Sequence, residues 1–600
     1  MSESKNKSIS EKLEEIAPSF CAAKWSQVLL NLQVGERHNC CLAPSQKIDA
    51  QLIQQNPQAF FNDSTLKEER EAMLKGEKIS ACHVCWKAEE NGHLSDRHHK
   101  SAATWSSKFL EKENLKTEGV IPSYVEVSFG NKCQLMCTYC NPHNSSSLAK
   151  ESKKYGPYLL SQDHNWLDKE NEELFLDENE NHPYATAFWN WFIQNNKNFE
   201  VLRFTGGEPL ISKWIHRFLD WLKDNSMEHA EIGFNSNLAV PIELLDSFIS
   251  KLKKIPTSHY KKINFYTSVD GWGKGAEIAR YGLKLDLFEK NFNRLMTEFP
   301  ASTFRITSTL NVIAFPDTLE LFKKVLEFKK KSTFKDQVAI VCYPIHYPRF
   351  LSLNWTKNLY QKHFDEILHF IEKNINEDEH QIGFYEFERD FFKKAVNFDE
   401  TINPQEGIID IFLYFSQFKM RKGIELVDLP IEIKSIVKLG EERLLQSKID
   451  DISINTWVRA EPWISDESKR KLIREYIYSK LVSGEHNIWD ALKVLLISVN
   501  QQFSYEWIPL LMTHYKTRLG AFELLYRKCI ENKDKYQLDM RHYVIEHINH
   551  FDDYNAKEII EYCRKLDLKW IREDKENILA KLDELKHPHQ IELFHLIKSS

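Results

Sequence analysis

The stretch Cys133-Gln134-Leu135-Met136-Cys137-Thr138-Tyr139-Cys140 decides how the rest of this chain is interpreted. It follows a run from Tyr124 to Phe129 whose residues alternate in polarity, so the cysteines are expected on a loop that leaves a β-strand. Three thiolates at this spacing can hold three irons of a cubane cluster and leave the fourth iron open. A zinc site would need a fourth protein ligand close by, and His143 is a poor candidate because it directly follows Pro142. The alternative is a degenerate zinc site or three unrelated buried thiols.

The pattern C-x3-C-x-aromatic-C, with Tyr139 as the aromatic residue, resembles the cluster loop of the radical S-adenosylmethionine (radical SAM) superfamily. Gly206-Gly207-Glu208-Pro209 follows at a distance typical of that superfamily. The resemblance implies that Cys133, Cys137 and Cys140 hold a catalytic [4Fe–4S] cluster whose open iron is chelated by the amino and carboxylate groups of SAM. Reductive cleavage of SAM would then yield a 5′-deoxyadenosyl radical, which abstracts hydrogen from a substrate.

Length and composition limit the class of protein. A chain of 600 residues is too long for one hydrophobic core, so several domains are expected. The net charge of −7 argues against a dedicated nucleic-acid surface. The polar start of the chain indicates no secretory signal, and no apolar stretch is long enough to span a membrane. We therefore expect a cytoplasmic protein, in which the 11 cysteines serve as metal ligands or buried thiols instead of disulfides.

A second group of cysteines precedes the first motif. The run from Gln27 to Leu32, followed by Gly35, predicts a hairpin with its turn at the glycine. Cysteines flank this hairpin, and a C-x2-C pair follows a helical segment predicted over 64–75. Four thiolates from these places can close either a zinc site or a complete [4Fe–4S] cluster, and the residues alone do not choose. The predicted ligands are Cys21, Cys40, Cys82 and Cys85.

The layout of this segment resembles the auxiliary-cluster modules, called twitch and SPASM, of radical SAM enzymes. Here the pattern precedes the core instead of following it, and its cysteines suffice for one cluster, which favours the smaller twitch type. Cys40 fits the spacing from the hairpin glycine better than Cys41 does. The run Arg97-His98-His99-Lys100 that follows is interpreted as a solvated linker.

From about residue 120, β-like runs alternate with helical stretches such as 211–224, which predicts parallel β/α units with right-handed crossovers. The resemblance implies a partial (β/α)6 TIM-like barrel, and the number of predicted strands agrees with it. The long gap between residues 141 and 198 suggests an inserted lid or loop. The predicted strands are 124–129, 200–205, 231–235, 263–269, 305–312 and 338–343.

Candidate cofactor ligands follow these strands, where function gathers in parallel sheets. By resemblance, Glu208 accepts from the amino group of SAM, and Ser268 and Asp270 lie near its ribose and carboxylate. Arg280 resembles a family arginine that reaches the SAM carboxylate, a role that suits a guanidinium fork. Asn237 matches a short family signature, with Leu238 where glycine is usual. The resemblance thus implies cofactor binding by Tyr139, Gly206, Gly207, Glu208, Pro209, Asn237, Ser268, Asp270 and Arg280.

After about residue 346 the β signal fades and leucine and aromatic residues recur at helical spacing, as in 472–481, 492–499 and 559–596. Cys342, Cys529 and Cys563 are expected to be buried thiols. The predicted organisation is therefore an N-terminal α+β auxiliary module over 1–119, the partial barrel over 120–345, and an α-helical domain over 346–600.

The sequence thus predicts a radical SAM enzyme with two iron–sulfur clusters, supplied with electrons by a flavodoxin- or ferredoxin-like reductant. Relatives with auxiliary clusters often modify ribosomally made peptides, so the resemblance implies a peptide or protein substrate. A carbohydrate or small metabolite is the alternative substrate class. A hypothesis of a different kind is a zinc-stabilised binding protein without catalysis.

Overall fold

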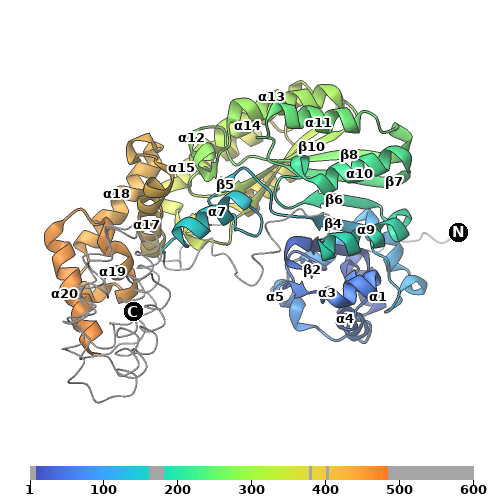
Figure 1. Ribbon diagram of the computed structural model, residues 1–600, viewed down its shortest axis with the longest axis horizontal. Coiled ribbons are helices and arrows are strands. Elements are labelled where there is room, and N and C mark those ends of the chain that lie inside the picture. The colour runs from blue at the N-terminus through green and yellow to red at the C-terminus, as the bar shows by residue number, and fades with distance from the viewer. Residues whose placement is uncertain (1–7, 161–181, 377–381, 397, 400–403, 484–600) are drawn as a thin grey trace, which may run out of the picture. The chain divides into compact units, whose positions relative to one another are not determined.

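The computed structural model describes residues 8–160, 182–376, 382–396, 398–399 and 404–483, with many helices around one large sheet (Figure 1). The strands are β1 (Gln27–Asn31), β2 (Glu36–His38), β3 (Gln46–Lys47), β4 (Tyr124–Ser128), β5 (Met136–Cys137), β6 (Val201–Thr205), β7 (Met227–Ser236), β8 (Tyr260–Ser268), β9 (Arg280–Tyr281), β10 (Thr303–Leu310) and β11 (Val338–Pro344).

The helices before β8 are α1 (Ile9–Ile16), α2 (Ala23–Ser26), α3 (Ala50–Gln55), α4 (Ser64–Leu74), α5 (His83–Glu90), α6 (Asp96–Ser101), α7 (Ser146–Tyr155), α9 (Pro183–Asn195), α10 (Lys213–Asp224) and α11 (Ile242–Leu252). Those after it are α12 (Lys274–Ala279), α13 (Leu285–Glu298), α14 (Thr318–Lys330), α15 (Lys357–Lys373), α16 (Glu386–Ala395), α17 (Pro404–Lys422), α18 (Ile431–Gln446), α19 (Ile454–Ala460) and α20 (Glu467–Ser483).

The large sheet has nine strands in the order β11-β10-β8-β7-β6-β4-β1-β2-β3. The strands predicted from the sequence are β4, β6, β7, β8, β10 and β11, and each pairs in parallel with its neighbour in chain order. This confirms the predicted α/β class and the parallel β/α units, although β7 is longer than the range 231–235. Whether these units close into a partial barrel stays a prediction.

The N-terminal cysteine segment continues the same sheet. The predicted hairpin is confirmed, since β1 pairs antiparallel with β2 and Gly35 lies at a φ of +62° in the turn. A Cβ at Gly35 would overlap the ring of Tyr184, so only glycine fits there. The sequence did not predict that β1 also pairs in parallel with β4, where Gln27 faces Tyr124.

One face of the sheet is a stacked apolar core. Phe204, Phe234, Phe265 and Phe304 stand on four adjacent strands, and their ring centroids are 5.2–6.1 Å apart in successive stacked pairs. Helices α10, α11 and α13 cover this face, for example through Phe218, whose ring lies 4.7 Å from that of Phe204. Burial of these large rings contributes to the apolar area that holds the helices to the sheet.

The other face of the sheet, here called the polar face, carries polar and partly exposed side chains. Residues paired across neighbouring strands share a face, as Glu126 and Arg203 do. Parallel sheets usually present apolar residues to covering helices on both faces, so this face is built for something other than a packed core. Its members include Tyr124, Glu126, Arg203, Thr205, Asn235, Tyr266, Ser268, Thr307, Thr309 and Tyr343.

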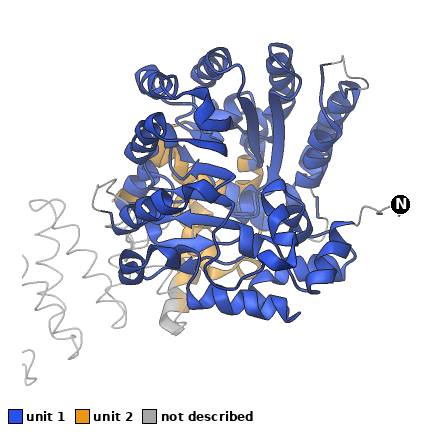
Figure 2. Cartoon of the chain, turned by 90° about the vertical axis from the view of Figure 1, so that its right-hand side faces the viewer, with its two compact units in different colours: residues 1–153, 164–411, 425–436 blue, residues 154–163, 412–424, 437–600 orange. Residues whose placement is uncertain are grey.

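The chain forms two compact units, which Figure 2 distinguishes by colour. Unit 1 comprises residues 1–153, 164–411 and 425–436 and contains the sheet, and unit 2 comprises 154–163, 412–424 and 437–600. In unit 1, Glu388 of α16 accepts a hydrogen bond from the Ile340 backbone N–H of β11 at 2.8 Å. In unit 2, the rings of Tyr158 and Tyr414 stack 4.5 Å apart. The domain boundaries at 119 and 345 stay predictions.

Other predictions about the chain have mixed outcomes. The helix predicted over 472–481 lies within α20, and the patterns at 492–499 and 559–596 fall outside the described residues. Cys342 is buried as expected, and Cys529 and Cys563 fall outside the described residues. The interval 141–198 contains α7 and α9, while 161–181 is not described.

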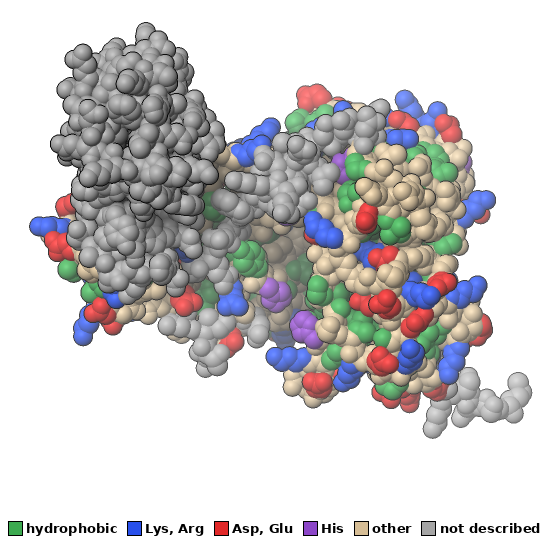
Figure 3. Space-filling view, turned by 60° about the horizontal axis from the view of Figure 1, so that its bottom comes forward, with side chains coloured by type: hydrophobic (Ala, Val, Ile, Leu, Met, Phe, Trp, Pro, Cys, Tyr) green, Lys and Arg blue, Asp and Glu red, His purple; other side chains and the backbone are tan. Residues whose placement is uncertain are grey.

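Two surface properties complete the description. Among the described residues, no helix has both the length and the apolar character needed to cross a membrane. On the face shown in Figure 3, basic and acidic side chains are interspersed over the described part of the surface.

Candidate functional site

The Cys133–Cys140 loop is held by a two-stranded sheet of its own. β5 pairs antiparallel with β9, so that Cys137 lies opposite Arg280. The next backbone N–H, of Thr138, donates to the carbonyl of Ala279 at 2.8 Å. The middle cysteine of the loop is therefore fixed beside a residue that lies far away in the sequence.

The three thiols of this loop lie close enough to affect one another. Burial raises the pKa of Cys137 to about 12 and that of Cys140 to about 11. Burial also raises the pKa of Cys133, and the neighbouring Cys137 and Cys140 raise it further. A bound metal ion would reverse these shifts, because its charge stabilises the thiolate form. Without a metal, these cysteines are therefore neutral thiols at neutral pH.

The glycine turn packs directly against the segment that precedes Cys133. Gly206 has a φ of +103°, and a Cβ on it would overlap the hydroxyl of Ser128. A Cβ on Gly207 would overlap the carbonyl oxygen of Lys132. The turn is fastened there by the Glu208 N–H, which donates to that same carbonyl at 2.7 Å. Only glycine permits so close a backbone approach.

The carboxylate of Glu208 joins two strand ends inside the protein. Glu208 is 2% exposed, and its oxygens accept from the backbone N–H groups of Leu210 at 3.1 Å and Asn237 at 2.8 Å. Burial raises its pKa to about 7 in spite of these hydrogen bonds, which act in the opposite direction. Each carboxylate oxygen has a further lone pair, so Glu208 can accept one more donor.

Asp270 is fully buried and is the centre of a hydrogen-bond network. One of its oxygens accepts from Arg280 Nη2 at 2.9 Å and from the Thr309 N–H at 3.0 Å, and the other accepts from the Tyr139 hydroxyl at 2.6 Å. The Arg280 guanidinium also lies 5.5 Å from the centroid of the Tyr139 ring. Asp270 therefore positions Tyr139 and Arg280, and its own oxygens are already occupied by protein donors.

Two buried polar atoms at the loop lack a hydrogen-bond partner among the described residues. They are Nε of Arg280, a donor, and Oε1 of Gln134, an acceptor. Buried polar groups are nearly always paired in native proteins. A bound group could pair with each of them: an acceptor with Nε of Arg280, and a donor with Oε1 of Gln134.

Asn237 connects its strand end to the loop. Its side-chain oxygen accepts from Gln134 Nε2 at 2.9 Å, and its amide nitrogen lies 3.7 Å from the sulfur of Cys133. The next residue, Leu238, has a φ of +48°, which side chains rarely adopt. The Leu238 side chain is fully buried, which supplies a packing reason for leucine where the resembling family has glycine.

Five of the predicted cofactor residues therefore form two bonded groups, both tied to the cysteine loop. The Ser268 hydroxyl instead pairs with that of Thr307 at 3.0 Å on the polar face, and Pro209 opens a short 3-10 helix. The first group contains Cys133, Glu208 and Asn237, and the second contains Tyr139, Asp270 and Arg280.

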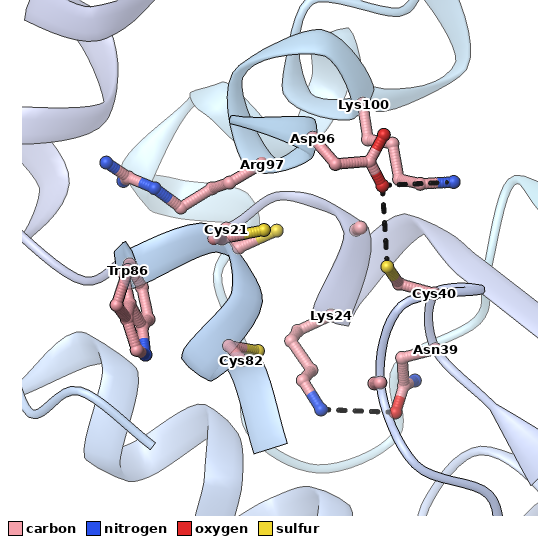
Figure 4. Close-up of a pocket in the computed structure, with 12 residues that line it drawn as sticks. Cys21, Lys24, Asn39, Cys40, Cys82, Trp86, Asp96, Arg97 and Lys100 are labelled. Carbon is pink, nitrogen blue, oxygen red and sulfur yellow. Dashed lines mark hydrogen bonds and ion pairs between the residues drawn. The ribbon is translucent and has the colours of Figure 1, made fainter. Parts of the chain in front are cut away.

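A separate pocket gathers four N-terminal cysteines, of which Figure 4 labels Cys21, Cys40 and Cys82. Cys21 precedes α2, Cys40 follows β2, Cys82 ends a 3-10 helix, and Cys85 lies in α5. All four line the same pocket. Burial raises the pKa of Cys82 to about 12, so without a metal this cysteine is a neutral thiol.

Cys40 and Cys41 line different pockets. Cys40 lies with the other three cysteines, and Cys41 lines a second pocket with Glu126 and Thr205 of the polar face. The sulfurs of Cys40 and Cys41 and a carboxylate oxygen of Asp96 nevertheless lie within 4.8 Å of one another. The four-cysteine pocket offers four thiolates to one centre, whereas this group offers two thiolates and a carboxylate. The choice of Cys40 stays a prediction.

The interpretation of Arg97-His98-His99-Lys100 as a solvated linker is wrong. These residues belong to α6, and Arg97 is 4% exposed. Arg97 binds the Glu89 carboxylate through Nε and Nη2, at 2.9 and 2.8 Å, and Lys100 lines the cysteine pocket. The Ser95–Asp96 pair at the helix start was the signal that could have revealed this helix.

Sequence reasoning also missed the charged centre of the polar face. The Arg203 guanidinium lies 3.8 Å from the Tyr266 ring centroid and donates to Asn235 Oδ1 at 2.7 Å. Glu126 lies 3.7 Å from Arg203 and accepts from the Tyr124 hydroxyl at 3.0 Å. The alternation of polar and apolar residues in these strands was the available signal.

No family model and no curated protein matches the sequence. Among solved structures, SuiB of Streptococcus suis bound to S-adenosylmethionine has 14% identity and a TM-score of 0.27, covering 56% of this chain and 68% of SuiB. SuiB bound to the precursor peptide SuiA has 12% identity and a TM-score of 0.27, covering 58% and 69%. A likeness at this level carries no argument about this chain.

Proposed function

We propose that this chain is a radical SAM enzyme, with Cys133, Cys137 and Cys140 as ligands of the [4Fe–4S] cluster that binds SAM. When bound, the cluster and SAM would supply the 5′-deoxyadenosyl radical that abstracts hydrogen from a substrate. The observation that carries the proposal is the β5–β9 pairing, which fixes the three-cysteine loop beside Arg280. Arg280 is buried there and keeps one donor, Nε, without a hydrogen-bond partner among the described residues.

The residues around the loop fit the amino-acid portion of SAM. The unpaired Nε of Arg280 would donate to a carboxylate, and the unpaired Oε1 of Gln134 would accept from an ammonium. Glu208 would add a second acceptor through a free lone pair. Asp270 would hold Arg280 and Tyr139 in place, which differs from a direct contact to SAM. Gly206 and Gly207 would leave room for close backbone approach.

We further propose that Cys21, Cys40, Cys82 and Cys85 hold an auxiliary [4Fe–4S] cluster in a twitch-like module over 1–119. Support comes from the shared pocket and from the lysines that line it. Tetrahedral zinc is the alternative that the same four thiols favour, and metal analysis separates the two.

The remaining proposals concern the substrate and its surroundings. A partial (β/α)6 barrel over 120–345 would enclose the polar face, and this face would contact the substrate. Its mixed donors and acceptors suit a peptide, and a carbohydrate or small metabolite is the alternative. Residues 346–600 would form the α-helical domain, and a flavodoxin- or ferredoxin-like protein in the cytoplasm would supply electrons.

The test is the variant in which Cys133, Cys137 and Cys140 are all alanine. Anaerobically purified wild-type protein should contain about eight irons per chain, from two cubane clusters. The triple variant should keep about half of them and form no 5′-deoxyadenosine from SAM and dithionite. Undiminished 5′-deoxyadenosine production would refute the proposal.

Cys342→Ala is the matched control, because Cys342 is a buried thiol on β11 outside both cysteine groups. This variant should keep all the iron and the full rate of SAM cleavage. A finding of stoichiometric zinc together with about four irons would show that the four-cysteine site holds structural zinc instead of a cluster. The radical SAM assignment would still stand.

A further inference from the structure

A buried lysine lies in the wall of the four-cysteine pocket. Lys24 belongs to α2, is 3% exposed and lines the pocket together with the cysteines (Figure 4). Its ammonium lies 3.4 Å from Asn39 Oδ1 and forms an ion pair with Glu69 of α4. Lysine is almost never fully buried unless it is paired, and the Glu69 pair holds this ammonium in the wall of a pocket that four thiols also line.

The charges around the pocket are unevenly arranged. Lys100 pairs with Asp96 at 3.7 Å, and Asp96 itself lies 3.5 Å from the Cys40 sulfur, so these two charges largely offset each other at the pocket. Arg97 is neutralised by its two hydrogen bonds to Glu89. Among the described residues, Lys24 has one ion pair, with Glu69, and its other contact is to the neutral amide of Asn39. Its ammonium therefore presents positive charge to the pocket, whose lining includes Asn39 but not Glu69.

We propose that Lys24, without binding iron, raises the reduction potential of the iron–sulfur cluster held by Cys21, Cys40, Cys82 and Cys85. The inference rests on the proposed function, since it requires that cluster. A cluster with four thiolate ligands is anionic and becomes more so on reduction. Net charge and burial near a cluster set its potential, so a buried cation favours the reduced state.

The Lys24–Glu69 pair makes the inference distinguishable from a structural role. Removing the positive charge should lower the potential, whereas removing the negative charge of Glu69 should raise it. A purely structural ion pair predicts that both substitutions weaken the fold in the same direction. The sign of the shift in reduction potential therefore distinguishes an electrostatic role from a structural one.

The experiment uses the full chain with Cys133, Cys137 and Cys140 replaced by alanine, so that only the auxiliary cluster is reduced. Its potential is measured by redox titration followed by EPR in this background, and again with Lys24→Met, Lys24→Arg, Glu69→Gln or Lys47→Met added. Lys24→Met should lower the equilibrium constant for one-electron reduction at least tenfold, which is about 59 mV. Glu69→Gln should shift the potential upward. Lys24→Arg should leave the potential close to that of the background variant, because the positive charge is kept. Lys47, an exposed lysine of β3 outside the pocket, should have no effect.

The outcomes distinguish a failure of the role of Lys24 from a failure of the proposed auxiliary cluster. An unchanged potential in Lys24→Met and Glu69→Gln, with the cluster present, overturns the role of Lys24 and leaves the auxiliary cluster standing. Absence of any reducible cluster in the background variant overturns both. If Lys24→Met does not fold, Glu69→Gln still decides, because Lys24 is retained and an upward shift is required.

Discussion

The two cysteine sites differ in how their ligands are brought together. The three cysteines of the 133–140 loop lie within one short stretch, and the β5–β9 pair only has to anchor that stretch beside Arg280. The four cysteines of the other site come from distant segments, which the β1–β2 hairpin and α5 bring to one pocket. The first site has three thiols with unpaired polar atoms beside them, and the second has four thiols with a lysine beside them. An incomplete ligand set next to unused polar groups indicates a site for a further ligand, and a complete set indicates a closed metal centre.

The largest expected effect is on the iron content of the two proposed centres. Replacing Cys82 and Cys85 together with serine should remove the second centre and about four of about eight irons per chain. SAM binding should persist, because every proposed SAM ligand lies elsewhere. Iron and sulfide analysis measures the loss. Cys41→Ser is the matched control and should keep all the iron, whereas loss of four irons in that variant would show that Cys41 is the ligand.

Breaking the buried network at the first site should destabilise the protein and also release its iron. Asp270→Asn removes the charge that pairs with Arg280, which for a buried pair costs about 3–5 kcal/mol of unfolding free energy. Denaturant unfolding measures this cost, and iron analysis measures occupancy of the loop.

Glu388→Gln is the matched control for Asp270→Asn. Glu388 and Lys329 form an equally buried ion pair at 2.9 Å, away from both cysteine groups. We expect a similar loss of stability with unchanged iron content. If both variants lose iron equally, the Asp270 network has no specific link to the cluster loop.

Arg280→Lys should weaken SAM binding more than it weakens the fold. Lysine keeps a positive charge for Asp270 but loses the fork that includes Nε. Loss of a charge-assisted hydrogen bond to a buried ligand costs about 2–5 kcal/mol, roughly 30-fold or more in affinity. Equilibrium binding of SAM to the reconstituted protein tests this. Arg294→Lys, on the exposed side of α13, should leave the affinity unchanged.

The smallest expected effect is a pH dependence from Glu208. Because its pKa is raised from 4.5 to about 7 in the folded state, the folded protein binds this proton more tightly than the unfolded chain does. The stability it contributes is fully present below pH 4.5 and is lost as the pH rises through about 7. One pKa unit is about 1.4 kcal/mol, so the loss amounts to about 3 kcal/mol.

The measurement is the difference in unfolding free energy between wild type and Glu208→Gln from pH 5 to 8. As the pH rises, the unfolding free energy of the wild type should decrease relative to that of Glu208→Gln. Saturating SAM should flatten the dependence, since a bound ammonium would lower the pKa of Glu208. A dependence that SAM leaves unchanged would contradict the proposed contact.

Much of the fold could be predicted because its signals are local. The β-like runs in the sequence marked the six parallel strands that follow residue 120, but not the short strands β5 and β9, and the glycine at 35 marked the hairpin turn. The parallel pairing of β1 with β4 could not be predicted, because its register depends on two segments far apart in the sequence. The burial of Arg97 could not be predicted for the same reason, because it depends on contact with Glu89 and the backbone of Phe20.

The sequence by itself determined the ligand types and their local spacing: the three cysteines with Tyr139, the glycines before Glu208, and the C-x2-C pair at Cys82. These are properties of neighbouring residues, so they survive without knowledge of the fold. Only the tertiary structure decided that Asp270 holds Tyr139 and Arg280 and that Cys40 shares a pocket with Cys21. Such contacts arise when strand order and helix packing bring distant segments together. Burial then requires the charged side chains among them to be paired, because an unpaired charge is costly in an interior without water.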